Sequence, residues 1–282
     1  MDQQKAIESF DSAAPGAMKQ LVVCADDFAV HEAASQGIAR LAMMGRISAT
    51  SVMVLSKRWT QDAPLLHDLR GRLDVGLHLD WTSDFAVSAG HGMPLAGAML
   101  KALLGGFNQA AARTVIERQL DAFEGQWKAA PDHVDGHQHV HQFAGIRQAL
   151  VETLARRYCD RKPYLRVSRA PAGQVDFKSR VIAAMGAIAI EKIAISVHIS
   201  RATALSGVYG FSGSTQDYAA RMALWLQTSP SQTIIMCHPA LTTEPGDSIG
   251  VARAQEFAYL SGDEFPAALT RCSATLTRGG DW

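Results

Sequence analysis

The amino-acid sequence predicts an α/β fold built around a parallel sheet. Short apolar runs of β-prone residues alternate with longer helical patterns from Leu21 onward, as in consecutive strand–helix units. About seven such runs occur in the 282 residues, a number that suggests a barrel. Ionisable residues recur at the ends of successive runs, and a barrel gathers such residues at its C-terminal rim.

The first strand–helix unit is the clearest. Residues 21–24 are expected to form a buried strand, and residues 32–44 a helix that stops at Gly45. Two Gly- and Ser-rich stretches, 80–106 and 200–214, are expected to be loops, the first of them at the active site. Further strands are expected at residues 49–54, 75–79, 133–135, 164–167, 193–197 and 233–237.

The composition predicts an ordinary soluble globular protein. Hydrophobic residues make up 48% of the chain, which is ample for a large core. The 27 Lys and Arg residues balance 27 Asp and Glu residues, so no net field would draw the chain to nucleic acid or to an anionic membrane. Small neutral or zwitterionic substrates fit that balance better.

Residues 1–19 are expected to form a flexible leader, and residues 20–282 a single domain. The leader has neither the basic start nor the apolar stretch of an export signal. The four cysteines are scattered and form no C-x-x-C pair, so they predict reduced thiols and no thiolate zinc site. No apolar run approaches membrane-spanning length, and a cytoplasmic location is expected.

An adjacent pair of carboxylates, Asp26 and Asp27, follows the first strand. Two like charges side by side raise each other's pKa unless a cation or hydrogen-bond donors offset the repulsion. A metal held by one of them would do so. Alternatively, one aspartate caps the next helix while the other is solvated. The local sequence leaves both interpretations open.

The richest segment is residues 133–141, HVDGHQHVH, in which five of nine residues could ligate or buffer a metal. If the strand persists through residue 140, its period of two places Asp135, His137, His139 and His141 on one face. Crowded imidazoles favour neutral rings around a metal, or a hydrogen-bonded relay. The alternative is a surface histidine cluster without function.

Three more ionisable residues, His78, Arg166 and His238, stand at predicted strand ends. Arg166 could orient a carboxylate, and His238 could donate a proton. Each also has an ordinary explanation: a core histidine, a surface ion pair and a turn histidine, respectively. Their shared position is the stronger signal, because a barrel would bring all three together at one rim.

Four ordered motifs resemble those of the YdjC-like carbohydrate deacetylases: residues 25–28 (ADDF), 76–79 (GLHL), 134–141 (VDGHQHVH) and 236–239 (MCHP). The resemblance runs from residue 21 to about residue 260. It implies an irregular TIM-like (β/α) barrel related to the NodB-type polysaccharide deacetylases. It also implies one divalent metal ion, zinc or magnesium, bound by Asp27, His78 and His137.

The same resemblance implies the roles of further residues. Asp26 corresponds to the catalytic base, His238 to the acid, and Arg166 to an arginine that steadies Asp26. Around the ligands, Asp135, His139 and His141 could form a supporting shell. Independently of the resemblance, four aromatic residues of the predicted loops, Trp81, Phe85, Tyr209 and Phe211, could stack on a sugar ring or simply pack.

Two positions depart from the family pattern. Ala29 stands where a glycine is usual, which predicts a slightly different turn because glycine there would have meant positive φ. Gln138 stands in Gly-His-Gln-His where Ser-His-His-His is common. In a strand its side chain would point away from His137 and His139.

The predicted function is hydrolysis of an N-acetyl group on an amino sugar or oligosaccharide, giving acetate and a free amine. A divalent ion would supply an acidified water and polarise the amide carbonyl, Asp26 would accept the proton, and His238 would protonate the amine. The expected partner is a small N-acetylated sugar, not nucleic acid or a membrane. The resemblance permits a homodimer.

Two alternative functions belong to other classes. The spacing of His137, His139 and His141 is that of a histidine-triad nucleotide hydrolase, although Gln138 stands where that motif needs a hydrophobic spacer. The second alternative is a catalytically silent sugar-binding barrel. The presence of both aspartates and of His238 argues against it.

Overall fold

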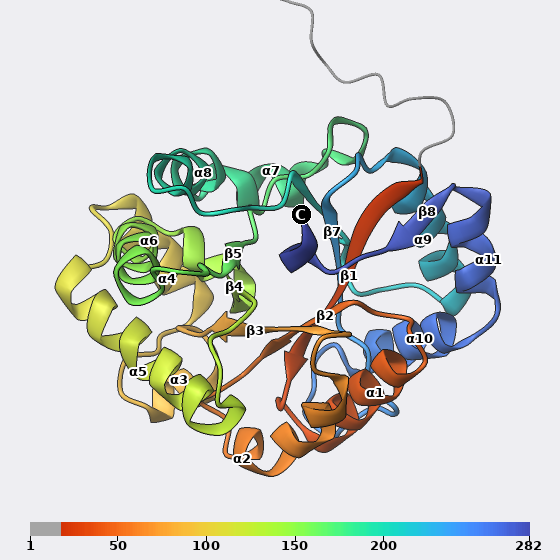
Figure 1. Ribbon diagram of the computed structural model, residues 1–282, viewed down its shortest axis with the longest axis horizontal. Helices are drawn as coiled ribbons and strands as arrows, with labels where there is room; N and C mark the ends of the chain where they lie inside the picture. The colour runs from red at the N-terminus through yellow and green to blue at the C-terminus, as the bar shows by residue number, and fades with distance from the viewer. Residues whose placement is uncertain (1–17) are drawn as a thin grey trace, which may run out of the picture.

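A curved parallel sheet forms the centre of the protein, and the helices lie around it (Figure 1). The computed structural model describes residues 18–282. Its strands are β1 (Lys19–Phe28), β2 (Ala49–Val52), β3 (Asp74–Leu79), β4 (His133–Gly136), β5 (Tyr164–Leu165), β6 (Ala204–Ser206), β7 (Thr233–Cys237) and β8 (Ala274–Leu276). Neighbouring strands follow the order β5-β4-β3-β2-β1-β7-β6, with β8 beside β1, and their pairings are parallel.

The helices connect most of these strands. The α-helices are α1 (Glu32–Met43), α2 (Arg58–Asp62), α3 (Asp84–Ser88), α4 (Leu95–Leu103), α5 (Gln109–Trp127), α6 (Ile146–Arg157), α7 (Phe177–Ala184), α8 (Ala187–Ser196), α9 (Thr215–Thr228), α10 (Gly250–Ser261) and α11 (Glu264–Arg271). Short 3₁₀ helices are η1 (Ala63–Leu69), η2 (His137–Gln142), η3 (Ala172–Gln174) and η4 (Gly279–Asp281).

The two edge strands of the path, β5 and β6, are joined by a single bridge instead of a ladder. Leu165 pairs with Arg201, just before β6. The Leu165 N–H donates to the Ser200 carbonyl at 2.9 Å, and the Ala202 N–H donates to the Leu165 carbonyl at 3.0 Å. The predicted irregular TIM-like α/β barrel is therefore confirmed as a parallel half-barrel. A regular TIM barrel, with matched strands all the way round, is not formed.

The central strand β1 is buried on both faces, which explains its continuous apolar run. Its residues alternate between two clusters, as the period of a strand requires. Leu21 and Val23 pack in the large core shared with the helices, whereas Val22 and Cys24 pack in a smaller cluster with side chains from β5, β6 and β7. By the same alternation, Asp26 continues the Val22 and Cys24 side of the strand.

Several predicted elements need correction. Residues 193–196 belong to helix α8 and Val197 is its C-cap, so no strand forms there, and the predicted loop 200–214 contains strand β6. The predicted loop 80–106 contains α3 and α4. The predicted leader lies outside the described residues apart from Met18 and Lys19, and Lys19 already begins β1.

Two other predictions concern the chain as a whole. Within residues 18–282, no helix has both the length and the apolar character needed to cross a membrane. The cytoplasmic location stays a prediction.

Candidate active site

A pocket of about 880 Å³ lies where the predicted site residues come together. Its polar lining includes Asp26 and Asp27 at the end of β1, His78 from β3, His137 from η2 and His238 after β7. The carboxyl ends of neighbouring parallel strands thus deliver these groups to one place. An apolar wall faces them, made by Leu95, Met99, Phe143, Val181, Ile182 and Met185.

Asp27, His78 and His137 form a compact group of donor atoms. Asp27 Oδ1 lies 3.1 Å from His137 Nδ1 and 3.5 Å from His78 Nε2. One ligand atom from each residue lies within 4.8 Å of the other two. Carboxylate oxygen and imidazole nitrogen suit a divalent ion such as zinc, and three protein ligands leave positions open for water or substrate. The donor set therefore fits the predicted metal.

Arg253 of helix α10 holds the second oxygen of Asp27. Its Nη2 donates to Asp27 Oδ2 at 2.7 Å, while its Nε donates to Asp247 Oδ2 at 2.8 Å. Burial raises the pKa of Asp27, but Arg253 and then His137 outweigh that effect and hold the pKa well below its usual range. Asp27 is thus an ionised carboxylate with Oδ1 turned toward the two histidines.

Asp135 sets the orientation of the His78 ring. His78 Nδ1 donates to Asp135 Oδ1 at 2.7 Å, which leaves Nε2 facing Asp27. Burial lowers the pKa of His78, but the Asp135 charge and hydrogen bond, followed by Asp26 and Asp27, raise it to about 9. This hydrogen bond from the far nitrogen to a carboxylate is the usual support of a metal-binding histidine.

Arg166 holds Asp26 at two points. Nη1 donates to Asp26 Oδ2 and Nη2 to Asp26 Oδ1, each at 2.6 Å, and Nη2 also lies 2.6 Å from Asp135 Oδ2. Asp26 and Arg166 are both buried. Because a guanidinium can only donate, both carboxylates face it as acceptors. Arg166 therefore links the Asp26 carboxylate to the residue that supports His78.

His238 lies beside Asp26 on the other side of the pocket floor. Its Nε2 is 3.9 Å from Asp26 Oδ2, and its ring meets Phe211 edge to face at 5.0 Å between centroids. The His238 backbone N–H donates to the Glu256 carboxylate. Burial lowers the pKa of His238 to about 4, so the ring is neutral at neutral pH.

The turn after β1 keeps the geometry that a glycine would favour. Ala29 has φ 72° and Asp27 has φ 65°, so the predicted change of turn is wrong. The Ser35 hydroxyl accepts from the Ala29 N–H at 3.0 Å. Neither aspartate caps helix α1, because His31 is its N-cap and accepts from the Ala34 N–H at 3.1 Å.

The histidine-rich segment does not continue as a strand. Strand β4 ends at Gly136, and both Gln138 (φ 52°) and His139 (φ 62°) take left-handed backbone conformations. The prediction of four side chains on one face is therefore wrong, and Gln138 does not lie in a strand but lines the pocket. His139 Nδ1 lies 3.0 Å from Ser168 Oγ, and His141 Nε2 donates to the Arg166 carbonyl at 2.9 Å.

Of the four aromatic residues predicted to stack on a sugar, Phe85 and Phe211 line the pocket. Trp81 is buried and packs edge-on against Phe107. Tyr209 is buried too, and its hydroxyl donates to Glu256 at 2.6 Å. The surroundings of Trp81 and Tyr209 are those of core residues.

Several residues around the site were not predicted from the sequence: Ser51, Asp247, Arg253 and Glu256. The contact between His133 and Ser51 was not predicted either. A signal was present for some of them. Arg253 and Glu256 stand three residues apart among apolar residues of α10, and Ser51 lies in a short strand whose residues are all buried. Buried polar groups in such positions need partners.

The family model for YdjC-like protein matches residues 20–271. A human carbohydrate deacetylase is 31% identical over 153 residues, which are 48% of this chain and 45% of that protein. A chitooligosaccharide deacetylase from Enterobacter sp. (strain 638) is 30% identical over 172 residues, 55% of this chain and 67% of that protein. The match thus spans less than half the length of the human relative.

A crystal structure from Enterococcus faecalis V583, provisionally assigned to cellobiose-phosphate cleavage, has a similar fold. Its TM-score is 0.71 at 18% sequence identity, and the match covers 94% of this chain and 99% of that one. The likeness concerns the fold alone. On the strength of the family match over residues 20–271, the chain belongs to the YdjC-like family.

Proposed function

We propose that this protein is a metal-dependent deacetylase that hydrolyses the N-acetyl group of an amino sugar or oligosaccharide, releasing acetate and a free amine. The observation that carries the proposal is the group formed by Asp27, His78 and His137, with the Arg166-bound Asp26 beside it in one pocket. The names of two relatives, carbohydrate deacetylase and chitooligosaccharide deacetylase, support the substrate class.

Asp27, His78 and His137 would hold one divalent ion, Zn²⁺ or Mg²⁺. When bound, the ion supplies positive charge that polarises the amide carbonyl and acidifies water. Asp27 can serve as a ligand without losing its support, because Arg253 contacts only its Oδ2. His78 can present Nε2 because Nδ1 is engaged with Asp135.

Asp26 would act as the base that takes the proton of the attacking water. It lines the pocket next to Asp27, and its carboxylate is kept in one orientation by the two Arg166 contacts. Because the carboxylate is already oriented, proton transfer to it needs no further ordering of the base, and the entropic cost of that ordering is avoided. Arg166 does not itself line the pocket, so it acts through Asp26.

His238 would deliver a proton to the leaving amine. Its lowered pKa, about 4, means that the ring must first take up a proton before it can give one. Asp26 is the group that collects a proton in the first half of the reaction, and its Oδ2 is 3.9 Å from His238 Nε2. Transfer from Asp26 to His238 and on to the amine balances the proton count without a further acid.

The pocket suits a small substrate. Its volume of about 880 Å³ is within the usual range for small-molecule sites. The apolar wall can cover an acetyl methyl group and the apolar face of a sugar ring, while Phe211 and Phe85 also line the pocket. We further propose that residues 20–282 work as one domain, and a homodimer stays a prediction.

The histidine-triad alternative finds no support in the site. Its three histidines would have to present their rings together, but His139 contacts Ser168 and His141 contacts the Arg166 carbonyl. Only His137 of the three is close to Asp27 and His78.

Metal analysis combined with product detection tests the proposal. The native chain is expected to bind one divalent ion and to release free amine and acetate from N-acetylglucosamine oligomers only when metal is present. Asp26→Ala should keep the metal and lose turnover. Glu152→Gln, which changes an exposed carboxyl paired with Arg113 outside the pocket, should keep both. Metal binding by the native chain without amine release across a panel of N-acetyl sugars would overturn the proposal in favour of a sugar-binding protein.

A further inference from the structure

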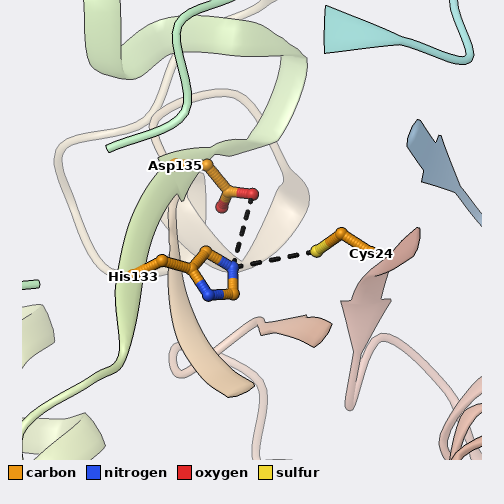
Figure 2. A group of neighbouring side chains, drawn as sticks. All are labelled: Cys24, His133 and Asp135. Carbon is orange, nitrogen blue, oxygen red and sulfur yellow. Dashed lines mark hydrogen bonds and ion pairs between the residues drawn. The ribbon is translucent and has the colours of Figure 1, made fainter. Parts of the chain in front are cut away.

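A second polar group lies buried behind the site, on the far side of Asp135. Figure 2 shows Cys24 from β1 facing His133 and Asp135 from β4. Ser51 of β2 completes the group, since its Oγ lies 2.7 Å from Asp135 Oδ2 and 2.9 Å from His133 Nε2. All four side chains are almost fully buried. None of them has been given a role above except Asp135.

The direction of these hydrogen bonds follows from the donors available. Asp135 receives hydrogen bonds from His78 and Arg166, so its carboxylate is an acceptor. The single hydroxyl proton of Ser51 must then go to Asp135, and Ser51 Oγ must accept from His133 Nε2–H. His133 Nδ1, left without a proton, has no hydrogen-bond partner among the described residues. The chain of donors therefore runs from His133 through Ser51 to Asp135.

The His133 ring is fixed from two directions. Gly76 of β3 leaves room for the ring, because a Cβ at that position would lie 2.3 Å from ring atoms of His133. Tyr164 of β5 stacks on the ring at 5.1 Å between centroids. Gly76 belongs to the GLHL motif that also supplies His78, so one short strand both makes space for His133 and provides the proposed ligand.

A metal ion in this second group is disfavoured by the position of Ser51. Its Oγ is 3.4 Å from Cys24 Sγ, 2.9 Å from His133 Nε2 and 2.7 Å from Asp135 Oδ2. His133 Nε2 itself is 3.8 Å from the sulfur and 3.9 Å from that oxygen. The hydroxyl thus stands between the three possible ligands, in the space that an ion would take.

We propose that Ser51 and His133 are positioning residues that fix the Asp135 carboxylate. Through Asp135 they orient both the proposed metal ligand His78 and the proposed base Asp26. Asp135 Oδ1 orients His78, and Asp135 Oδ2 meets Arg166, which holds Asp26. Loss of the Ser51 hydroxyl removes one of the three hydrogen bonds that hold Asp135, so the carboxylate shifts and its contacts with His78 and Arg166 change together. The inference rests on the proposed function: its effect on Zn²⁺ affinity rests on the proposed metal site, and its effect on kcat rests on the proposed deacetylation.

The test compares variants on two neighbouring positions of β2. Ser51→Ala removes the hydroxyl that faces Asp135. Thr50→Val is the matched control, because the Thr50 hydroxyl donates to the Ala25 carbonyl at 2.8 Å and takes no part in the group. At His133, His133→Phe keeps a ring but loses the donor, and His133→Gln keeps an N–H near the position of Nε2.

Zn²⁺ affinity, measured by competition with a chelator, is the first readout. Ser51→Ala and His133→Phe are expected to bind Zn²⁺ roughly 10- to 100-fold more weakly than the native chain. Thr50→Val should bind within about twofold, and His133→Gln should recover most of the loss. The second readout is kcat, which should fall in the same two variants with KM little changed.

Two outcomes would overturn the inference. One is native Zn²⁺ affinity in Ser51→Ala together with a lowered melting temperature, which would leave Ser51 a merely structural residue. The other is a second Zn²⁺ bound by the native chain and lost in His133→Phe. Failure of the proposed function would look different. Zn²⁺ affinity would follow the predicted order, but neither the native chain nor any variant would release amine. If Ser51→Ala does not fold, the His133→Phe and His133→Gln pair decides.

Discussion

Arg166 contacts Asp26 with two parallel hydrogen bonds, each 2.6 Å long, between its terminal nitrogens and the two carboxylate oxygens. Neither residue is more than 2% exposed. In such a buried pair, no water replaces a donor that is removed. The orientation of Asp26 thus depends on one side chain that follows strand β5.

Replacing Arg166 with lysine should lower kcat. A single ammonium cannot make both parallel contacts, so Asp26 loses its fixed orientation even though the positive charge remains. We expect Arg166→Lys to reduce kcat by about 10²-fold or more, with a small change in KM. Arg169→Lys is the control, because Arg169 pairs with Glu191 instead. Full native kcat in Arg166→Lys would refute the assigned role of Arg166.

Metal binding should release a proton from His78. Its pKa is raised to about 9, chiefly because Asp135 offsets the effect of burial, so the ring is protonated at neutral pH in the metal-free chain. A metal needs the Nε2 lone pair. Apparent affinity should therefore rise by about tenfold per pH unit from pH 7 and level off near pH 9. Calorimetry in buffers of different ionisation enthalpy measures the proton, and heats that do not depend on the buffer would contradict the prediction.

Mild acid should destabilise the fold. Burial lowers the pKa values of His133, His141 and His238 to about 4, below the ordinary 6.5. The stability that these neutral rings contribute is complete above pH 6.5 and is lost as pH falls toward 4. At pH 5 the loss in the free energy of unfolding is on the order of 2 kcal/mol per ring. Glu256 and Asp74, whose pKa values burial raises to about 7 and about 6, have the opposite sign in this range and offset part of the loss. The contribution of His78 also has the opposite sign, but it changes only between pH 6.5 and 9. Urea unfolding should give a smaller free energy at pH 5 than at pH 7, and an unchanged value would count against neutral buried rings.

Two glycine substitutions should change stability in opposite directions. Gly76→Ala places a methyl group 2.3 Å from the His133 ring and should lower the free energy of unfolding by about 3 kcal/mol. Gly125→Ala lies at an exposed position in the last turn of α5 with open space around it, and it should raise that free energy by roughly 0.5–1 kcal/mol. Chemical unfolding of both variants measures the difference. Equal stability of Gly76→Ala and the native chain would mean that His133 is not confined there.

The α/β class could be predicted because a strand that is buried on both faces has a continuous apolar sequence, as β1 does. In short segments, an apolar run can be assigned to the wrong secondary structure. The largely apolar run at residues 193–197 forms the end of helix α8 and its C-cap, and a run of that length does not distinguish a strand from a helix. Strand β6 has only three residues in a Gly- and Ser-rich stretch, so no pattern marks it.

The residues of the site could be named from their positions at strand ends, but their contacts could not. Asp27 and Ala29 take positive φ in a turn that a sequence pattern does not show. The end of β4 at Gly136 separates His137 from His139 and His141, whereas a strand would have grouped them. The support from Arg253 comes from a helix more than 220 residues away in the chain, and only the fold brings it to Asp27.

The central claim is that one divalent ion binds between Asp27, His78 and His137, next to Asp26. Anomalous X-ray diffraction at the zinc absorption edge, from crystals grown with Zn²⁺, tests it most directly. The account predicts one peak within bonding distance of Asp27 Oδ1, His78 Nε2 and His137 Nδ1. A peak among Cys24, His133 and Asp135 instead, or crystals of active enzyme that show no peak at the three ligands, would contradict it.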